Sequence, residues 1–353
     1  MKHVMPNLRE TLRHLDDRAW RWIFGEADYM GLHPPLSLRL KIAARLPAQW
    51  IAPTSCKEPI FIVGCPRSGT TLLFGIFHRS SHLSSFRQES HWVWEFMHPP
   101  RNRSDHSQVL RAEDLTERSQ RFIQACYGAA FGQNRFVDKC PTNSLRIGAI
   151  KHIFPDAKIV CLTRNGPDNV SSLIDTWTST DRFAGFDVPE ELNISGYGRQ
   201  KWVHLLEPGW QEYAQRPIEE VGAHQWTTVN NMLQEEKETV DDRDWIEVRY
   251  EGLLEDPLST ISDLFDKLNL PLESEVADYV DALDDNVVNT STQPDIGKWQ
   301  WRNPDRVRRV MDMIRPVMEQ LGYSPSFRKE IGMVESNTSG DLRGDKPGAA
   351  SSN

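Results

Sequence analysis

The segment 59–73 joins a short apolar run to a glycine-bearing turn of the kind that holds phosphate. Its sequence is PIFIVGCPRSGTTLL. Ile60–Val63 is a β-branched and aromatic run that is typical of a buried parallel strand. Gly64 and Gly69 allow a sharp turn and a close approach of the backbone to a ligand. The helix expected next points unpaired N–H groups into this turn, so the segment predicts an anion site.

The spacing of this turn nearly matches the Walker A pattern, with one informative difference. Gly64, Gly69 and Thr71 fit G-x-x-x-x-G-x-[ST], but Thr70 stands where that pattern has lysine. In an ATP-splitting loop the lysine reaches the β- and γ-phosphates. The cation of this turn is instead Arg67. The turn therefore predicts a phosphate site that lacks the group needed to handle a γ-phosphate.

A second strand and turn carry another pair of groups suited to phosphate. Lys158–Leu162 reads as a buried strand that leads into Arg164, and Ser172 lies eight residues later on a helix expected at Asp168–Trp177. A guanidinium and a helix hydroxyl can converge on one phosphate. Together, the two turns predict a ligand that carries phosphate groups at two places.

The elements that position these turns alternate between strand and helix patterns along most of the 353-residue chain. This alternation predicts an α/β fold with a central parallel sheet flanked by helices on both faces. Further strands are expected at Leu83–Phe86, Arg135–Lys139 and Asp244–Tyr250. Further helices are expected at Leu8–Leu46 with breaks at His33–Pro35 and Pro47, and at Thr70–Arg79, Glu113–Phe131, Leu145–Ile153, Glu219–Val240, Leu258–Leu268 and Pro304–Leu321.

The composition divides the chain into three parts. Residues 1–50 are predicted to form a helical segment packed on the core, and residues 51–334 one large domain. Residues 335–353 are rich in Ser, Gly, Asp and Asn and are predicted to be a disordered tail. Within the domain, residues 178–225 are irregular, and long segments of this kind are usually functional covers. We expect this insertion to cover the molecule that enters the site.

The charge and cysteine content exclude several classes of protein. The net charge is −9, from 41 basic and 50 acidic residues, which argues against a general nucleic-acid or anionic-membrane surface. The five cysteines form neither a C-x-x-C pair nor a zinc spacing, so buried reduced thiols are expected. There is neither a run of about 18 apolar residues nor a signal-peptide core. We therefore expect a soluble, cytoplasmic protein without a transmembrane segment or a nucleic-acid partner.

The two phosphate turns together resemble the PAPS-dependent sulfotransferase family. Its members transfer a sulfuryl group from 3′-phosphoadenosine 5′-phosphosulfate (PAPS), and the resemblance spans residues 59–323. It implies a P-loop NTPase-like fold. In this fold Arg164 and Ser172 would hold the 3′-phosphate, and Tyr250 would border the adenine. Lys298 and Trp299 would close the 3′-phosphate end of the site. The 5′-phosphosulfate would then be held by Arg67, Ser68, Gly69, Thr70 and Thr71.

The residue at position 67 also narrows the branch of the family. The cytosolic small-molecule branch usually has lysine where this chain has Arg67. An arginine here resembles the carbohydrate- and protein-directed branch and its bacterial relatives. Arginine can grip two oxygens at once and stays charged, so the two residues are not equivalent. The resemblance therefore favours that branch over an enzyme for phenols or steroids.

Sulfuryl transfer needs positioning and charge stabilisation more than covalent help from the protein, by analogy with phosphoryl transfer. Arg67 and backbone N–H groups can neutralise the leaving group, so this chemistry requires no metal. A base must accept the acceptor's proton, and Glu89 is the first candidate by its resemblance to the branch. His91 is the second, since an imidazole titrates near neutral pH. In the alternative interpretation neither residue is the base: Glu89 pairs with Arg87, and His91 is the first residue of a helix.

Lys139 resembles a lysine that faces the donor in the same branch, where it would stabilise charge on the sulfuryl group. In the alternative interpretation it is a strand-end lysine in solvent.

Tryptophans are a further candidate set, either for an acceptor cleft or, more commonly, for core packing. They are Trp92, Trp94, Trp177, Trp202, Trp210 and Trp226.

The identity of the acceptor is left open by the sequence. It is a hydroxyl or an amine of a small-molecule, carbohydrate, peptide or lipid-linked compound, and the oligomeric state is equally open. Two other functions compete with sulfuryl transfer. The first is a P-loop nucleotide or small-molecule kinase, which the missing lysine opposes. The second is a PAPS-binding protein without activity, which the intact Arg67, Thr70, Arg164 and Ser172 oppose.

Overall fold

The computed structural model describes residues 35–179, 185–283 and 295–324. The expected helix before residue 35 and the tail 335–353 therefore lie outside the described residues. At the centre is a four-stranded parallel sheet in the order β2-β1-β3-β6. Its strands are β1 (Ile60–Val63), β2 (Val137–Lys139), β3 (Lys158–Thr163) and β6 (Trp245–Arg249). The predicted central parallel sheet is confirmed.

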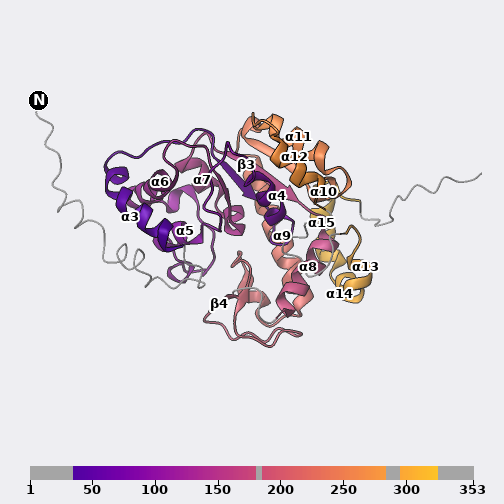
Figure 1. Cartoon of the computed structure of the whole chain (residues 1–353). Coiled ribbons are helices and arrows are strands. Elements are labelled where there is room, and N and C mark those ends of the chain that lie inside the picture. Colours follow the sequence, from indigo (N-terminus) through magenta and orange to yellow (C-terminus); the bar gives the residue numbers. More distant parts are fainter. Residues whose placement is uncertain (1–34, 180–184, 284–294, 325–353) are drawn as a thin grey trace, which may run out of the picture.

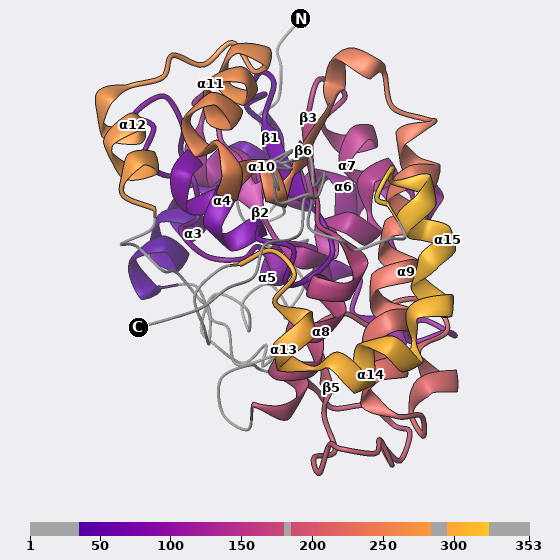
Figure 2. The same cartoon turned by 90° about the vertical axis from the view of Figure 1, so that its right-hand side faces the viewer.

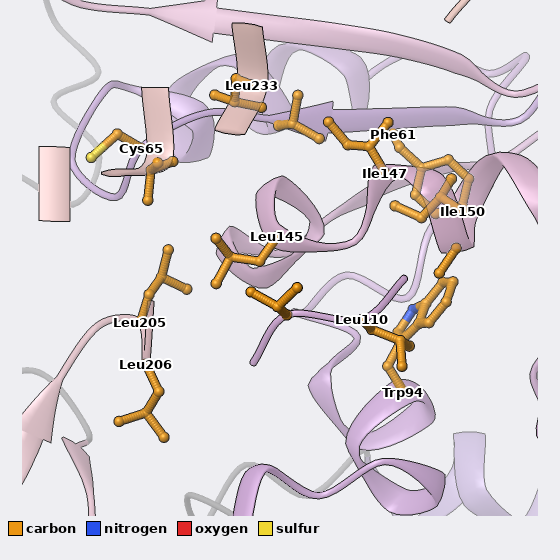
Figure 3. Packing of buried hydrophobic residues seen from close by; sticks show 14 of the residues in the cluster. Phe61, Cys65, Trp94, Leu110, Leu145, Ile147, Ile150, Leu205, Leu206 and Leu233 are labelled. Carbon is orange, nitrogen blue, oxygen red and sulfur yellow. The ribbon is translucent and has the colours of Figure 1, made fainter. Parts of the chain in front are cut away.

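The sheet is buried on both faces, and neighbouring residues of β1, β3 and β6 enter different apolar clusters. In β1, Phe61 and Val63 join one cluster, and Ile60 and Ile62 join the other. Figure 3 shows Phe61 packed beside Ile147 and Ile150 within the first of these clusters. All four residues of β1 are at most 1 % exposed, which explains why the strand reads as an unbroken apolar run.

Helices cover the two faces of the sheet in separate groups, as Figures 1 and 2 show. One face carries α4 (Thr70–Phe77), α10 (Tyr250–Glu255), α11 (Pro257–Lys267) and α12 (Ser274–Asp281). The other face carries α3 (Leu36–Ile51), α5 (His91–Met97), α6 (Glu117–Phe131), α7 (Ile147–Ile153), α8 (Gly166–Thr178), α9 (Ile218–Lys237), α14 (Pro304–Arg309) and α15 (Met311–Gln320). The short α13 (Trp299–Arg302) lies against α8.

Three expected elements differ in the structure. Helix α3 continues through Pro47 to Ile51, because its packing against α6 buries Ile42 and Leu46 completely. The expected strand Leu83–Phe86 is reduced to one parallel bridge between Ser84 and Phe136. The expected helix Pro304–Leu321 is divided at Val310 into α14 and α15.

The segment 178–225 is only partly an insertion. A two-stranded antiparallel sheet forms from β4 (Gly185–Phe186) and β5 (Trp202–Val203). Its last residues belong to α9, which packs against α8 and buries Gln225 completely. Among the described residues, no helix is both long and apolar enough to cross a membrane.

Candidate active site

The turn between β1 and α4 lies at the carboxyl end of the sheet, where parallel strands commonly meet their ligands. Gly69 precedes α4 at φ 103°, and a Cβ there would strike the ring of Tyr250. A Cβ on Gly64 would stand 2.5 Å from the carbonyl oxygen of Leu162. Both glycines are therefore required by close contacts as well as by the turn. Thr70 and Thr71 form the first turn of α4, whose N–H groups face the site.

The second phosphate turn packs directly on the first. The Nη1 of Arg164 donates to the carbonyl oxygen of Arg67 at 3.0 Å, and Asn169 donates to that of Pro66 at 2.9 Å. Arg67 has a φ of 69°, and its Nε donates to Ser172 Oγ at 3.4 Å. Arg67, Arg164 and Ser172, which the sequence assigned to two phosphate sites, thus adjoin one another.

Two buried donors in this region have no hydrogen-bond partner within the described residues. They are Ser68 Oγ and Arg164 Nε. Buried donors are nearly always paired in folded proteins, and an unpaired one costs about 1–3 kcal/mol. An anionic ligand with several oxygens would satisfy both. The residues present therefore fit a phosphate- and sulfate-bearing nucleotide.

Tyr250 and the segment 297–299 complete the nucleotide side of the site. The guanidinium carbon of Arg164 lies 4.4 Å from the centre of the Tyr250 ring. Asp168 accepts hydrogen bonds from the backbone N–H groups of Gly297 at 2.7 Å and Trp299 at 3.0 Å. This contact holds Lys298 beside the amino end of α8.

Charges near Lys298 bear on its role. Burial lowers the pKa of its ammonium, and the nearby Arg164 and Arg302 lower it further, against Asp175 and Asp168, which raise it. An anion placed among these cations would relieve their repulsion. The indole of Trp299 is buried and belongs to the larger apolar cluster, and its backbone N–H donates to Asp168.

Glu89 joins the first phosphate turn through Lys139 at the end of β2. The Nζ of Lys139 donates to Glu89 Oε1 at 2.6 Å and to Thr71 Oγ1 at 3.2 Å. The other oxygen, Glu89 Oε2, lies 3.1 Å from Nε2 of His91, the first residue of α5. Lys139 is 5 % exposed and therefore is not a solvent-facing lysine at a strand end. Glu89 pairs with Lys139 and His91, whereas the alternative reading paired it with Arg87.

The electrostatics of the two candidate bases differ. Burial alone would raise the pKa of Glu89, but Lys139 and then His91 hold it far below the ordinary value. Burial alone would lower the pKa of His91, but the neighbouring Cys140 and Glu95 raise it well above the ordinary value. These directions favour an ionised Glu89 and a protonated His91. This arrangement favours Glu89 over His91 as the proton acceptor.

His204 is a residue of the site that the sequence did not identify. It follows β5 at a φ of 74°, and its Nε2 lies 2.6 Å from the hydroxyl of Thr176 on α8. Burial and the charge of Arg67 lower its pKa to about 3, while Glu89 acts in the opposite direction. His204 therefore lies close enough to Arg67 and to Glu89 for both charges to act on its ring. A lone histidine in an irregular segment carries no motif that marks it.

The six tryptophans are buried in the core. All are at most 7 % exposed and belong to the larger apolar cluster. Within the described residues there is no group of three His, Cys, Asp or Glu side chains that could hold a metal ion.

Comparison with known proteins agrees with this geometry. The model of the family described as "Sulfotransferase family" matches residues 59–193, which include both phosphate turns and Glu89. Protein-tyrosine sulfotransferase A of Caenorhabditis elegans is 21 % identical over 294 residues, which cover 76 % of this chain and 67 % of that protein.

Solved structures share the fold at low sequence identity. The sulfotransferase STF9 of Mycobacterium avium is similar with a TM-score of 0.50 and 13 % identity, covering 91 % of this chain and 87 % of that one. A sulfotransferase of Alicyclobacillus acidocaldarius has a TM-score of 0.46 and 15 % identity, covering 76 % of this chain and 98 % of that one. The kinase alternative is not favoured by the matching family model and the matched relative. The family model and the relative therefore show that the segment with both phosphate turns is similar to sulfotransferases, and the structure shares the fold of a solved sulfotransferase.

Proposed function

We propose that this sulfotransferase moves the sulfuryl group of PAPS to a hydroxyl of its acceptor, with Glu89 as the base and Lys139 as the group that stabilises the transferring sulfonate. The observation that carries this proposal is the contact of Lys139 with both Thr71 of the phosphate turn and Glu89. One ammonium thereby connects the donor loop to the candidate base. Such a cation is well placed for charge that develops between donor and acceptor.

The chemistry follows from these positions. The acceptor oxygen forms a bond to sulfur, and the bond between sulfur and the bridging oxygen of the 5′-phosphosulfate breaks. The electron pair of that bond leaves with adenosine 3′,5′-bisphosphate (PAP), while the hydroxyl proton passes to Glu89. Arg67 and the N–H groups of α4 face the leaving phosphate and stabilise its added charge.

The nucleotide would be held at both phosphate ends. The 5′-phosphosulfate would rest on the turn from Arg67 to Thr71, where Ser68 Oγ has no partner among the described residues. The 3′-phosphate would be held by Arg164 and Ser172, with Lys298 beside them. The ring of Tyr250 offers a face for the adenine, and Trp299 anchors the segment that closes this end.

The proposed acceptor follows from the matched relative and from the residue at position 67. The matched relative is named a protein-tyrosine sulfotransferase, and Arg67 favours the carbohydrate- and protein-directed branch and its bacterial relatives. A peptide tyrosine is therefore the first acceptor to test, followed by sugar and lipid-linked alcohols. A cytoplasmic location remains part of this proposal, and cell fractionation tests it.

The donor site is tested by calorimetry with PAP and ATP on the purified protein. We expect PAP to bind and ATP to bind much more weakly. Arg164→Ala should weaken PAP binding about 10–100-fold, since a hydrogen bond to a charged group contributes about 1.5–3 kcal/mol. The control is Arg243→Ala at the amino end of the sheet, where the side chain is 79 % exposed. Equal binding of PAP and ATP, or unchanged binding in Arg164→Ala, would contradict the donor site.

The base is tested with the isosteric variant Glu89→Gln. Its turnover should fall by about 10²–10⁴-fold, the usual contribution of a general base, while its PAP affinity is retained. Turnover is measured as sulfated product by mass spectrometry, with EDTA present in one arm to test for a metal requirement. Turnover at the wild-type rate would remove Glu89 from this role.

A further inference from the structure

Behind Glu89 lies a chain of buried polar side chains that ends on the segment after β5. His91 Nδ1 lies 3.1 Å from Glu95 Oε1, one helical turn along α5. The amide of Gln108 donates to the same oxygen of Glu95 at 2.8 Å. Glu95 and Gln108 are each 6 % exposed, and His91 is 4 % exposed. Polar groups buried this deeply are retained where they hold one another in place.

Both ring nitrogens of His91 face carboxylate oxygens. Nε2 meets Glu89 and Nδ1 meets Glu95, an arrangement in which a charged imidazole donates to both carboxylates. The other charged or titratable groups around the ring are Lys139 and Cys140 at the end of β2 and Arg146, which donates to Thr142 beside the ring. Of these neighbours, Glu89 and Glu95 are the carboxylates that favour the charged ring.

The far end of the chain reaches the segment that follows His204. The backbone N–H of Gln108 donates to the carbonyl oxygen of Leu206 at 2.8 Å, and the N–H of Leu206 donates back to the Gln108 side chain at 2.9 Å. Figure 3 shows Leu205 and Leu206 on the side of the apolar cluster where Cys65 of the phosphate turn lies. This series of hydrogen-bonded side chains therefore links the candidate base to the proposed acceptor cover.

We propose that Glu95 is a positioning residue for sulfuryl transfer: it keeps His91 charged and oriented, so that His91 holds Glu89 Oε2 and leaves Glu89 Oε1 to take the acceptor's proton. This inference rests on the proposed role of Glu89 as the base. In the free enzyme Oε1 is held by Lys139. The negative sulfonate of the donor attracts the Lys139 ammonium and so draws it away from Oε1. His91 contacts the other oxygen, Oε2, and can keep that contact.

The variant Glu95→Gln keeps the shape of the side chain but removes its charge. The pKa of the His91 imidazole should then fall, because one of its two carboxylate partners has lost its charge. Below the lowered pKa the ring is charged and activity is retained. Above it the ring becomes neutral, and kcat should fall by about tenfold at pH 8, a fraction of the 10²–10⁴-fold effect of a general base. The wild type should show no such loss between pH 6 and 8, and PAP affinity should be equal in both proteins.

A second measurement does not depend on activity. In protein with ¹⁵N-labelled histidine, the ring nitrogens of His91 should report a charged imidazole at pH 8 in the wild type and a neutral one in Glu95→Gln. Glu95→Asp retains the charge and should largely restore both the charged ring and the pH profile. It also serves as the test if Glu95→Gln does not fold. The matched control is Glu219→Gln, another carboxylate 6 % exposed, which pairs with Arg309 outside the site.

The outcomes separate this inference from the proposed function. An inactive Glu89→Gln together with a wild-type pH profile and a charged His91 in Glu95→Gln would overturn the positioning role alone. Wild-type turnover in Glu89→Gln would overturn the base and, with it, this inference. A loss of kcat in Glu95→Gln that is the same at pH 6 and pH 8 would indicate a merely structural role and would also overturn it.

Discussion

At the scale of single residues, the site depends on charges that are held in place before any ligand binds. Lys139 contacts Thr71 and Glu89, and His91 approaches the same carboxylate from the other side. A carboxylate held by two cations is a weak base, as the lowered pKa of Glu89 shows. Binding of a donor with several negative charges would draw Lys139 away and raise that pKa. We infer that donor binding prepares the base.

His204 provides a test of the acceptor side at the same scale. The Thr176 hydroxyl donates to the carbonyl oxygen of Leu173 at 2.8 Å, so it accepts a hydrogen bond from His204 Nε2. The pKa of the ring is lowered, so the ring is neutral beside Arg67 and Glu89 and suits an uncharged hydroxyl better than sulfonate oxygens. His204→Gly should therefore lower kcat/KM for the acceptor by about tenfold or more, the effect of one lost hydrogen bond to a buried site.

Glycine suits position 204 because the backbone there has a positive φ. At a φ of 74° glycine is unstrained, so removal of the ring should leave the fold and PAP affinity intact. Steady-state kinetics with varied acceptor, alongside calorimetry with PAP, check this. The matched control is His106→Gly, a second histidine at a positive φ of 51°, which lies outside the site. If PAP affinity falls as much as kcat/KM, His204 serves the donor and not the acceptor.

At the scale of elements, the unit from β1 to α4 is the part that sequence patterns predicted best. A parallel strand buried on both faces has to be apolar throughout, and a phosphate turn requires glycines at fixed places, so both leave a local signal. The same holds for β3 and the turn at Arg164. These local rules place the donor side of the site without knowledge of the remaining fold.

Other elements depended on contacts that no local pattern reveals. Pro47 removes one helical hydrogen bond, at a cost of about 3 kcal/mol or more, yet the packing of α3 on α6 outweighs this. The expected strand at Leu83–Phe86 is reduced to one bridge at Ser84, and Arg87 follows it at a φ of 61°. His204 and the chain through Glu95 and Gln108 arise from tertiary packing alone.

The turn before α4 gives a prediction at the element scale. In Gly69→Ala the new Cβ would strike the Tyr250 ring, at a backbone φ of 103° that alanine rarely adopts. Strain of this kind costs about 1–3 kcal/mol and displaces the ring that faces the adenine. We expect a lower melting temperature and a large loss of PAP affinity. The control is Gly198→Ala, whose Cβ would meet no atom within 4 Å. Unchanged PAP affinity in Gly69→Ala would show that the close fit is not needed.

At the scale of the whole molecule, one buried carboxyl makes stability depend on pH. Glu207 is fully buried beside Gln225, and desolvation raises its pKa to about 8. The charged or titratable groups near it are His224, with Nε2 at 3.8 Å, and the Cys65 thiol. In the unfolded chain the same carboxyl ionises near its ordinary value of 4.5. Between pH 4.5 and about 8 the folded state therefore retains a proton that the unfolded state loses.

The sign of the effect follows from this difference. The stability that the neutral carboxyl provides is complete below pH 4.5 and is lost as the pH rises toward 8. Glu207→Gln removes the titration, so it should be more stable than the wild type at pH 8, by about 2–5 kcal/mol for a shift of this size, and nearly equal to it at pH 4.5. Urea unfolding at both pH values measures this difference. A constant difference between the two proteins at both pH values would contradict the assignment.

Asp244, a carboxyl whose pKa is lowered in the folded protein, serves as the control. Burial alone would raise the pKa of Asp244, but its contacts with Lys151 and Lys158 at 2.9 Å lower it. Asp244→Asn should therefore be less stable than the wild type near neutral pH and approach it as the pH falls below 3.8. Opposite trends in the two variants would show that both measurements follow individual carboxyl groups, since a general loss of packing would lower stability equally at every pH.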